Sequence, residues 1–426
     1  MSLILESDSE ISPSASRVDR AWSVVAGAGL LMFVNLGPVL YYTSGVFTKA
    51  ITDDTGWTRG TIAAAGLPAN LLITSTLPLV GWAVDAYGTR RIALLSSILF
   101  AIGMSLLGQF SQTPALYSLL LVVAYACGFA LTPLPYAQIV SGWFDKRRGL
   151  ALGLMLTMSG LATALFPPLS SALITEFGWR NAYALLGFIV FAIGAFAAVV
   201  LLRDPPQLTN KTLGREDSTP GLPVRSALTR RAFWTLFAGF FLISIAIGGG
   251  STSLPLILTD RGVPPQQASF IMTIVGATMV VGRLSLGALL DRMFAPRLTA
   301  MVFLAPTVAF GVLLLPDTTS ANAMIAAGFL GLALGAEVDA LTYIVSRAFG
   351  IRYLGRILGF LMVAFTLGLA FGPALFGKIH DQLQNYELAL WGAAGISALA
   401  SALIATLQRS DLPFATEQAA ASGRIH

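Results

Sequence analysis

The stretch GWAVDAYGTRR, residues 81–91, has a counterpart in GALLDRMFAPR, residues 287–297. The residues that the two stretches share lie 206 positions apart: Gly81, Asp85 and Arg91 in the first, and Gly287, Asp291 and Arg297 in the second. A second region keeps this offset, with Gly149, Gly153 and Pro167 corresponding to Gly355, Gly359 and Pro373. One offset across two distant regions predicts that the chain consists of two duplicated halves.

The composition around these stretches is that of a membrane protein. Of the 426 residues, 55% are hydrophobic and only 11% are charged, whereas soluble proteins carry about 25% charged residues. Twelve apolar stretches are long enough to span a bilayer: 22–48, 60–84, 92–110, 114–140, 149–176, 180–202, 232–259, 266–290, 298–315, 320–346, 354–379 and 386–407. Because an open sheet edge cannot be satisfied in lipid, we expect an all-α integral membrane protein with two pseudo-symmetric six-helix bundles.

The positions of the basic residues predict the orientation. Twelve spans place both termini on one side of the membrane. If that side is the cytoplasm, 20 of the 26 Lys and Arg residues lie in the cytoplasm, five lie outside and Arg283 lies within the membrane. The five outside are Lys49, Arg59, Arg180, Arg261 and Lys378. This is the positive-inside pattern, so the net charge of +5 reflects topology and gives no indication of nucleic-acid binding.

The longest loop, residues 203–231, is basic and rich in proline and glycine, and it lies between the sixth and seventh spans. Such a composition predicts a linker. The expected organisation is a disordered cytoplasmic tail (1–20), an N-terminal bundle (21–202), a cytoplasmic linker (203–231), a C-terminal bundle (232–408) and a second cytoplasmic tail (409–426).

The first loop motif resembles that of a known family. Gly81, Asp85, Gly88, Arg90 and Arg91 match G-x-x-x-D-x-x-G-x-R-R, the motif of the major facilitator superfamily, and the resemblance extends from about residue 20 to 408. Three further stretches, DTGWTRGTIAAAG (54–66), WFDKRRGLALGL (143–154) and FGWRNAYALLGF (177–188), resemble bacterial monocarboxylate porters and oxalate/formate-type exchangers. The resemblance implies a transporter in the inner membrane of a bacterium.

The motif also predicts a gate. Asp85 lies at a helix end, where its carboxylate can face another helix N-terminus or an arginine and form a latch that breaks as the halves rock. Gly287, Asp291 and Arg297 would form the equivalent in the second half. The alternative is a basic loop that only sets the topology.

Three ionisable residues lie well inside predicted spans, away from their ends: Arg283 in the eighth, and Glu337 and Asp339 in the tenth. A charge at the bilayer centre costs about 2.5–3.5 kcal/mol or more, so these side chains should face the bundle interior. Arg283 precedes Asp291 by eight residues and Asp339 precedes Arg347 by eight, which places both roughly 12 Å inside the membrane. Because positions i and i+2 do not share a helix face, only one acid should face a wet cavity, and we favour Asp339.

The resemblance assigns Arg283 a role, since an eighth-helix arginine binds the substrate carboxylate in oxalate/formate-type exchangers and monocarboxylate transporters. A guanidinium can hold a carboxylate through two hydrogen bonds and stays charged. The alternative is a structural ion pair between Arg283 and Asp339 or Glu337. Both can hold if the pair opens when substrate takes the arginine and a proton takes the acid, which is our hypothesis for proton symport.

The chain departs from both families at two positions. The exchangers carry a second cation, a lysine in the eleventh helix, where this chain has Phe365. Animal monocarboxylate transporters place an aspartate one turn before the arginine, where this chain has Met279. The missing lysine predicts a substrate with one carboxylate, and the missing aspartate argues against direct transfer of the animal mechanism.

Polar and aromatic residues in other spans are candidate substrate contacts. These are Asn35 and Tyr42 in the first span, Tyr136 and Gln138 in the fourth, and Phe365 in the eleventh. With Arg283 they would line an amphipathic, ring-rich cavity suited to an aromatic or branched monocarboxylate. The alternative for each is a place in the packed core or at the membrane interface.

The chain offers little for metal or covalent chemistry. It has one cysteine, Cys127, and two histidines, His380 and His426, so we expect no disulfide, metal site or histidine-based catalysis. The stretch FGPALFGKIH (371–380) approaches a nucleotide-binding loop but has Ile379 where Ser or Thr must reach Mg²⁺. We therefore expect neither an enzyme nor a bound cofactor.

The sequence thus predicts a secondary active transporter that moves a small monocarboxylate by proton-coupled alternating access. Its partners would be the carboxylate, a proton and the lipid bilayer, and we expect a monomer. Two alternatives are anion exchange and efflux of a hydrophobic compound. Efflux is the weaker of the two because the fifth span, SGLATALFPPLSS (159–171), lacks the G-P-x-x-G-G element typical of efflux members.

Overall fold

The computed structural model describes residues 13–144, 148–203, 221–290, 292–315, 320–350 and 352–414. Most of the predicted tails and linker lies outside these ranges. In the first half the elements are α1 (Pro13–Phe33), η1 (Gly37–Tyr41), α2 (Ser44–Thr55), α3 (Arg59–Tyr87), α4 (Thr89–Phe110), α5 (Pro114–Cys127), α6 (Pro133–Trp143), α7 (Arg148–Phe196) and η2 (Ala197–Leu201). In the second half they are α8 (Val224–Leu228), α9 (Arg231–Asp260), α10 (Pro265–Leu290), α11 (Ala295–Leu313), α12 (Ser320–Phe349), α13 (Leu354–Leu383), α14 (Glu387–Ala405) and η3 (Arg409–Asp411).

The helices follow the predicted spans with three differences. The fifth and sixth spans run together as α7, which turns at Gly178 with φ 76°, a left-handed conformation that glycine adopts without a steric penalty. The first span is divided into α1, η1 and α2, and the fourth into α5 and α6. Among the described residues, nine helices are long and apolar enough to cross a membrane, and one of them, Gly149–Leu201, contains the turn at Gly178.

The interruptions in the first and fourth spans touch each other. The N–H of Leu36 donates to the carbonyl of Leu131, 3.2 Å away. Pro133 opens α6 and has no N–H to continue a helix, so the fourth span breaks before it. Broken spans of this kind are typical of the centre of transporters.

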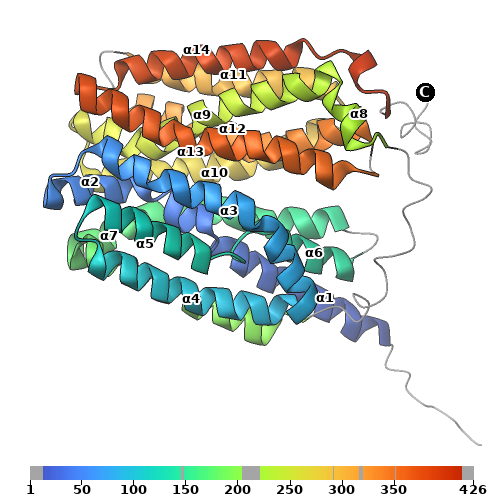
Figure 1. The fold of residues 1–426 in the computed structure, drawn as a ribbon, viewed down its shortest axis with the longest axis horizontal. Helices are drawn as coiled ribbons and strands as arrows, with labels where there is room; N and C mark the ends of the chain where they lie inside the picture. The colour runs from blue at the N-terminus through green and yellow to red at the C-terminus, as the bar shows by residue number, and fades with distance from the viewer. Residues whose placement is uncertain are drawn as a thin grey trace, which may run out of the picture.

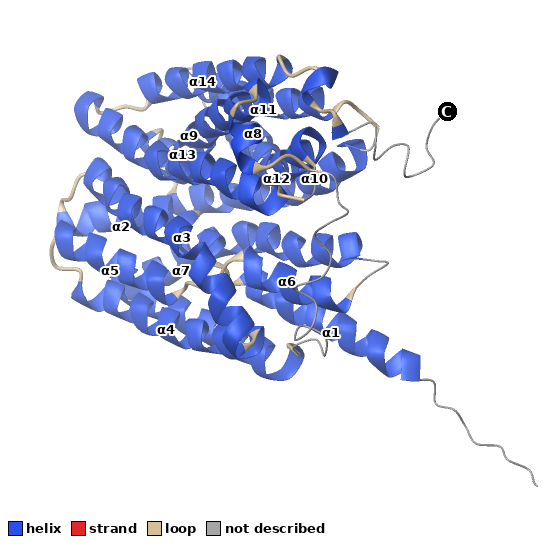
Figure 2. Cartoon of the chain, turned by 45° about the vertical axis from the view of Figure 1, so that its right-hand side comes forward, coloured by secondary structure: helices blue, strands red, loops and turns tan. Residues whose placement is uncertain are grey.

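The two halves form separate bundles. One large cluster of buried hydrophobic side chains lies between residues 24 and 202, and a second lies between residues 227 and 412. Figure 1 shows the helices running side by side across the molecule, and Figure 2 shows α8 to α14 grouped above α1 to α7. Each half therefore has its own core, and the halves meet along a shared surface.

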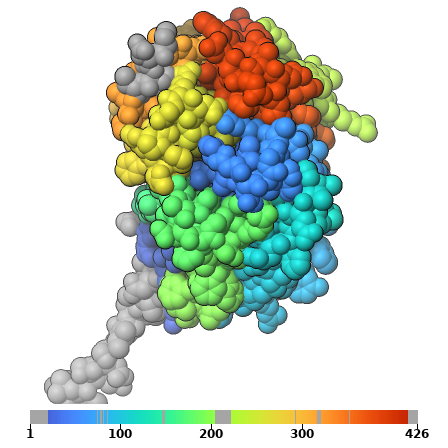
Figure 3. All heavy atoms as spheres, turned by 90° about the vertical axis from the view of Figure 1, so that its left-hand side faces the viewer, coloured from blue at the N-terminus to red at the C-terminus, as the bar shows by residue number. Residues whose placement is uncertain are grey.

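We name the two ends of the molecule by their loops. The linker face carries residues 203 and 221 and the α3–α4 turn, at the right of Figure 1. The opposite face carries the connections α2–α3 and α9–α10, at the left. Figure 3 looks onto the opposite face, where segments of the two halves meet without a visible opening between them.

Small residues bring the halves together toward the opposite face. A Cβ added to Gly276 of α10 would collide with the backbone of Ala164 in α7, and one added to Gly377 of α13 would collide with Gly60 of α3. Toward the linker face the repeated glycines are open instead. A Cβ added to any of these glycines would have no heavy atom of another element within 4 Å. They are Gly149, Gly153, Gly287, Gly355 and Gly359. The halves are thus in close contact toward the opposite face, whereas the repeated glycines near the linker face pack against no other element.

Candidate functional site

Arg283 joins the two halves at their interface. Its Nε donates to Oδ2 of Asp339 in α12, 2.9 Å away, and its Nη1 donates to the carbonyl of Leu156 in α7, 3.0 Å away. The Arg283 side chain is 14% exposed and that of Asp339 is 33% exposed. The guanidinium is therefore mostly buried, with an acid from its own half and a backbone oxygen from the other half as partners.

Close packing of α10 against α12 sets up this pair. Gly335 lies against the backbone of Met279 and Arg283, and Gly282 lies against the backbone of Leu332. Because residues four apart lie on one face of a helix, Asp339 follows Gly335 on the side that faces α10. The glycines let the helices approach until the short aspartate side chain reaches the arginine.

Glu337 lies in a different environment from Asp339. Its side chain is 3% exposed, and its Oε2 is buried without a hydrogen-bond partner. It interacts electrostatically with Arg283 and with the hydroxyl groups of Tyr41 and Tyr42. The structure thus brings both acids near one arginine, with Asp339 directly paired and Glu337 buried nearby.

The two candidate contacts of the first span have different surroundings. Tyr42 is partly buried, packs against the core of the second half and meets Tyr41 edge-on at 5.3 Å between ring centroids. The side-chain amide of Asn35 donates to the carbonyl of Met32 and, at 3.1 Å, to Oγ of Ser159, while its oxygen accepts the N–H of Gly37. In this conformation Asn35 holds the junction between α1 and η1.

The remaining candidate contacts are dispersed. Tyr136 is fully buried in the first core, where its hydroxyl has no hydrogen-bond partner. Phe365 is buried in the second core, and Gln138 is exposed on α6. The single ring-rich cavity proposed from these residues therefore stays a prediction.

The loop motif is only partly described. Gly88 ends α3 and begins α4 with φ 83°, and Nη2 of Arg90 donates to the carbonyl of Val199, 2.8 Å away. Arg91 is exposed, as is Arg297, whose guanidinium lies 5.9 Å from the ring of Phe294. Asp291 and the side chain of Asp85 lie outside the described residues, while Gly81 lies within α3. The predicted latch at this loop therefore stays a prediction.

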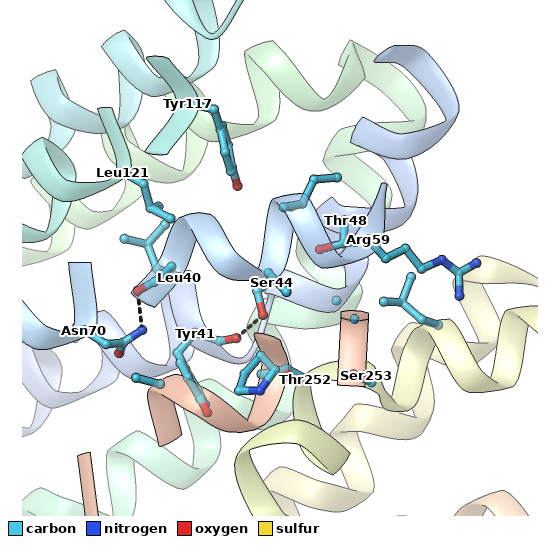
Figure 4. Close-up of a pocket in the computed structure, with 18 of the residues that line it drawn as sticks. Leu40, Tyr41, Ser44, Thr48, Arg59, Asn70, Tyr117, Leu121, Thr252 and Ser253 are labelled. Carbon is cyan, nitrogen blue, oxygen red and sulfur yellow. Dashed lines mark hydrogen bonds between the residues drawn. The ribbon is translucent and has the colours of Figure 1, made fainter. Parts of the chain in front are cut away.

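A cavity of about 70 Å³ lies between the halves toward the opposite face. Hydroxyl groups from both halves line it: Tyr41, Ser44, Thr48, Tyr117, Tyr125 and Tyr183 from the first half, and Thr252, Ser253 and Tyr386 from the second. Figure 4 shows Tyr117 and Leu121 on one side of it and Thr252 and Ser253 on the other. The hydroxyl of Tyr41 donates to the carbonyl of Leu369, 2.9 Å away, and so links the halves. Small polar residues within apolar spans were the signal for this cavity, and the sequence interpretation missed it.

Metal and ligand groups are sparse in the part of the chain that the structure describes. No group of three or more His, Cys, Asp or Glu side chains is arranged to hold a metal ion there. Cys127 is a free, half-buried thiol. The guanidinium of Arg283 is a group that can bind a small anion.

Comparisons with known proteins agree with this architecture. The family model of the Major Facilitator Superfamily matches residues 24–350. Monocarboxylate transporter 3 of Rattus norvegicus is 28% identical over 371 residues, covering 83% of this chain and 71% of that protein. Monocarboxylate transporter 11 of Mus musculus is 26% identical over 314 residues, covering 71% and 68%. The MFS-type transporter pytF of Aspergillus terreus is 27% identical over 283 residues, covering 64% and 90%.

Two solved structures share the fold. The nucleoside transporter NupG, as its D323A mutant, superposes with a TM-score of 0.73 at 13% identity, covering 91% of this chain and all of that one. A bacterial homologue of the human lysosomal transporter Spinster, in an inward-facing and occupied conformation, gives 0.64 at 17% identity, covering 96% of each chain. The all-α membrane fold predicted from the sequence is confirmed.

Proposed function

Because the chain belongs to the Major Facilitator Superfamily and is therefore a multi-pass membrane transporter, we propose that it moves a small monocarboxylate by proton-coupled alternating access. The observation that carries this proposal is the placement of Arg283. A nearly buried guanidinium at the interface of two halves, with one carboxylate and one carbonyl as partners, has the chemistry to bind an anion there. Monocarboxylate transporters among the relatives support this substrate class.

Arg283 needs an anion in every state of the cycle. Leaving one member of a buried ion pair alone costs about 3–5 kcal/mol. Asp339 supplies that anion when the site is empty. A substrate carboxylate would replace Asp339 at Nε and Leu156 at Nη1, which keeps the guanidinium paired and frees the two halves from their direct link.

Glu337 is the acid that we assign to the proton. A charged carboxylate buried with an unpaired oxygen loses several kcal/mol of hydration, and the Oε2 of Glu337 is in that position. Asp339, which is partly exposed and paired, would serve as the exchangeable counter-ion. A substrate carboxylate on Arg283 and a proton on Glu337 then cross together without net charge.

The absence of a second cation supports a substrate with one carboxylate. Phe365 takes the position of the exchangers' lysine, and it is 8% exposed within the second core. The described residues around Arg283 therefore offer one guanidinium to one carboxylate.

The charge pattern assigns the linker face to the cytoplasm, since 20 of the 26 basic residues belong to that side. We place the protein, as a monomer, in the inner membrane of a bacterium with both termini in the cytoplasm. The close contact of the halves toward the opposite face, with unpacked glycines near the linker face, would then correspond to a state open to the cytoplasm.

Uptake into proteoliposomes tests this function. A panel of aliphatic and aromatic monocarboxylates is offered with and without an acidic exterior, to the wild type and to Arg283→Ala. Arg292→Ala, an exposed arginine just beyond α10, is the matched control. Saturable, acid-driven uptake that is lost only in Arg283→Ala supports the proposal. Uptake that depends only on an internal counter-anion indicates exchange, and uptake indifferent to Arg283 would overturn carboxylate binding there.

A further inference from the structure

An ion pair joins the halves at the opposite face. Arg59, the first residue of α3, donates from Nη1 and Nη2 to the two oxygens of Asp260, the last residue of α9, each at 2.6 Å. The side chain of Arg59 is 11% exposed and that of Asp260 is 33% exposed. A two-pronged contact of this kind is the strongest geometry for an arginine and a carboxylate.

His380 shares this carboxylate with Arg59. Its Nε2 lies 3.4 Å from Oδ2 of Asp260, while its Nδ1 is buried without a hydrogen-bond partner. Its ring lies 4.7 Å from that of Tyr386, whose hydroxyl accepts a hydrogen bond from Nη1 of Arg59 at 3.3 Å. The imidazole and the guanidinium thus surround one carboxylate and one phenol.

A second contact fixes the position of Arg59. The N–H of Gly60 donates to Oδ2 of Asp381 at 3.0 Å, and Gly60 packs on Gly377. The carboxylate of Asp381 therefore sits at the N-terminus of α3, where the helix dipole favours a negative charge. This contact holds α3 against α13, so that Arg59 reaches Asp260.

The ion pair closes the hydroxyl-lined cavity. Arg59 and Tyr386 line that cavity together with Tyr41 and Ser253, and Figure 4 shows Arg59 at its edge. Separation of Arg59 from Asp260 would open the cavity to the opposite face.

We propose that Arg59, Asp260 and His380 form a proton-sensitive latch, which holds the opposite face closed and opens when His380 takes up a proton. In the closed latch, a protonated His380 would place a second cation beside Arg59, and both would compete for Asp260. When the halves separate, Arg59 leaves with the first half, while Asp260 and His380 remain together in the second. A protonated imidazole then replaces the guanidinium as the partner of Asp260, so proton uptake favours the open latch.

The latch goes beyond the proposed transport reaction and does not depend on the identity of the substrate. An acidic medium at the opposite face would favour the state that is open to that medium. Under the proposed symport, that is the state that would load substrate and proton together.

Other charged groups lie near the latch, and a test must distinguish their titration from that of His380. Asp260 and Asp381 lie beside the imidazole, and Arg59 lies on the facing element. Arg261 follows Asp260 and interacts with Glu387. Burial and the Arg59 guanidinium lower the pKa of His380 in the closed latch. Free carboxylic acids ordinarily titrate near pH 4 and free imidazole near pH 6.5, so a response between about pH 7.5 and about pH 5.5 reports on histidine.

Thiol labelling from the opposite face tests the latch. Ser253, 5% exposed in the cavity wall, is replaced by cysteine in a Cys127→Ser background, and a membrane-impermeant thiol reagent is applied to vesicles that present this face. Labelling is expected to rise about tenfold from about pH 7.5 to about pH 5.5, relative to a reference cysteine at the exposed Asn385. A thiol by itself reacts more slowly in acid, so a rise cannot come from the reagent.

Two variants test the roles of Arg59 and His380 in the latch separately. Arg59→Gln is expected to label fast at both pH values, and His380→Gln to label at one pH-independent rate. His426→Gln, which changes the only other histidine, is the matched control and should behave as the wild type. Arg59→Gln labelling as slowly as the wild type would overturn the latch, and a pH response that survives in His380→Gln would overturn the role of His380.

Discussion

Replacing Asp339 by asparagine should strengthen substrate binding while it weakens the empty protein. Asp339 occupies the Nε of Arg283 at 2.9 Å, so a substrate carboxylate must displace it before it can bind. Asparagine keeps the shape and removes the charge, and the competition is lost. A purely structural ion pair would also lose stability in this variant but would show no gain in binding.

The size of the effect follows from the burial of the pair. Two unit charges 4 Å apart attract by about 4 kcal/mol at an effective dielectric constant of 20. Because the Asp339 side chain is 33% exposed, solvent screening reduces this, and we take about 1–3 kcal/mol as the loss of stability in the empty state. About 1.4 kcal/mol of relieved competition corresponds to tenfold tighter binding of the carboxylate.

Thermal unfolding in detergent, with and without a monocarboxylate, measures both parts. Asp339→Asn should melt a few degrees lower when empty and should recover more than the wild type does at saturating carboxylate, since a ligand at 100 times its Kd adds about 2.7 kcal/mol. Isothermal titration gives the Kd directly. Asp53→Asn, which removes an exposed partner of Lys49, should change neither quantity. If Asp339→Asn binds the acid no more tightly than the wild type, Asp339 is not the displaced counter-ion.

Three further outcomes follow from the same geometry. Glu337→Gln should still bind the carboxylate but should lose acid-driven accumulation, because glutamine cannot exchange a proton; accumulation equal to that of the wild type would refute the assignment. Gly153→Leu should bind substrate but transport at least about tenfold more slowly, because the side chain fills space that the linker face needs in order to close. Gly395→Leu, at an equally open position on α14, should transport normally, and equal rates in the two variants would contradict this reasoning. Hydrogen bonds from Trp179 and Arg180 lower the pKa of Asp54. The ionised carboxylate therefore stabilises the fold at pH values above the usual pKa of an aspartate, and this contribution is lost as the pH falls through the lowered pKa. Since Asp54 is half exposed, Asp54→Asn should cost less than about 1 kcal/mol near neutral pH and nothing in acid, as melting curves at several pH values would show.

The sequence by itself identified the fold and the charged residues of the proposed site. Apolar runs of bilayer length can only become helices in lipid, and a repeat at one offset of 206 residues marks two halves whatever their packing. Arg283, Glu337 and Asp339 were found in the same way, because a charge in an apolar span carries an energetic cost in any arrangement of helices.

The pairing of these charges was beyond the sequence. Whether Asp339 or Glu337 meets Arg283 depends on the rotation of α12 against α10, and the contact of Gly335 with the backbone of Arg283 sets that rotation. The polarity of Tyr136 and the aromatic ring of Phe365 are equally compatible with a cavity and with a core, and the structure places both in cores.

The latch at the opposite face came from tertiary structure alone. Arg59 and Asp260 are separated by 201 residues, and in the sequence each is an ordinary charge at the end of a span. Composition and spacing determine which residues must avoid lipid, because the free-energy cost of a charge in hydrocarbon is local to each helix. The partner of each charged residue is decided only when the helices pack together, because the energy of an ion pair arises from the contact between helices that are distant in the chain.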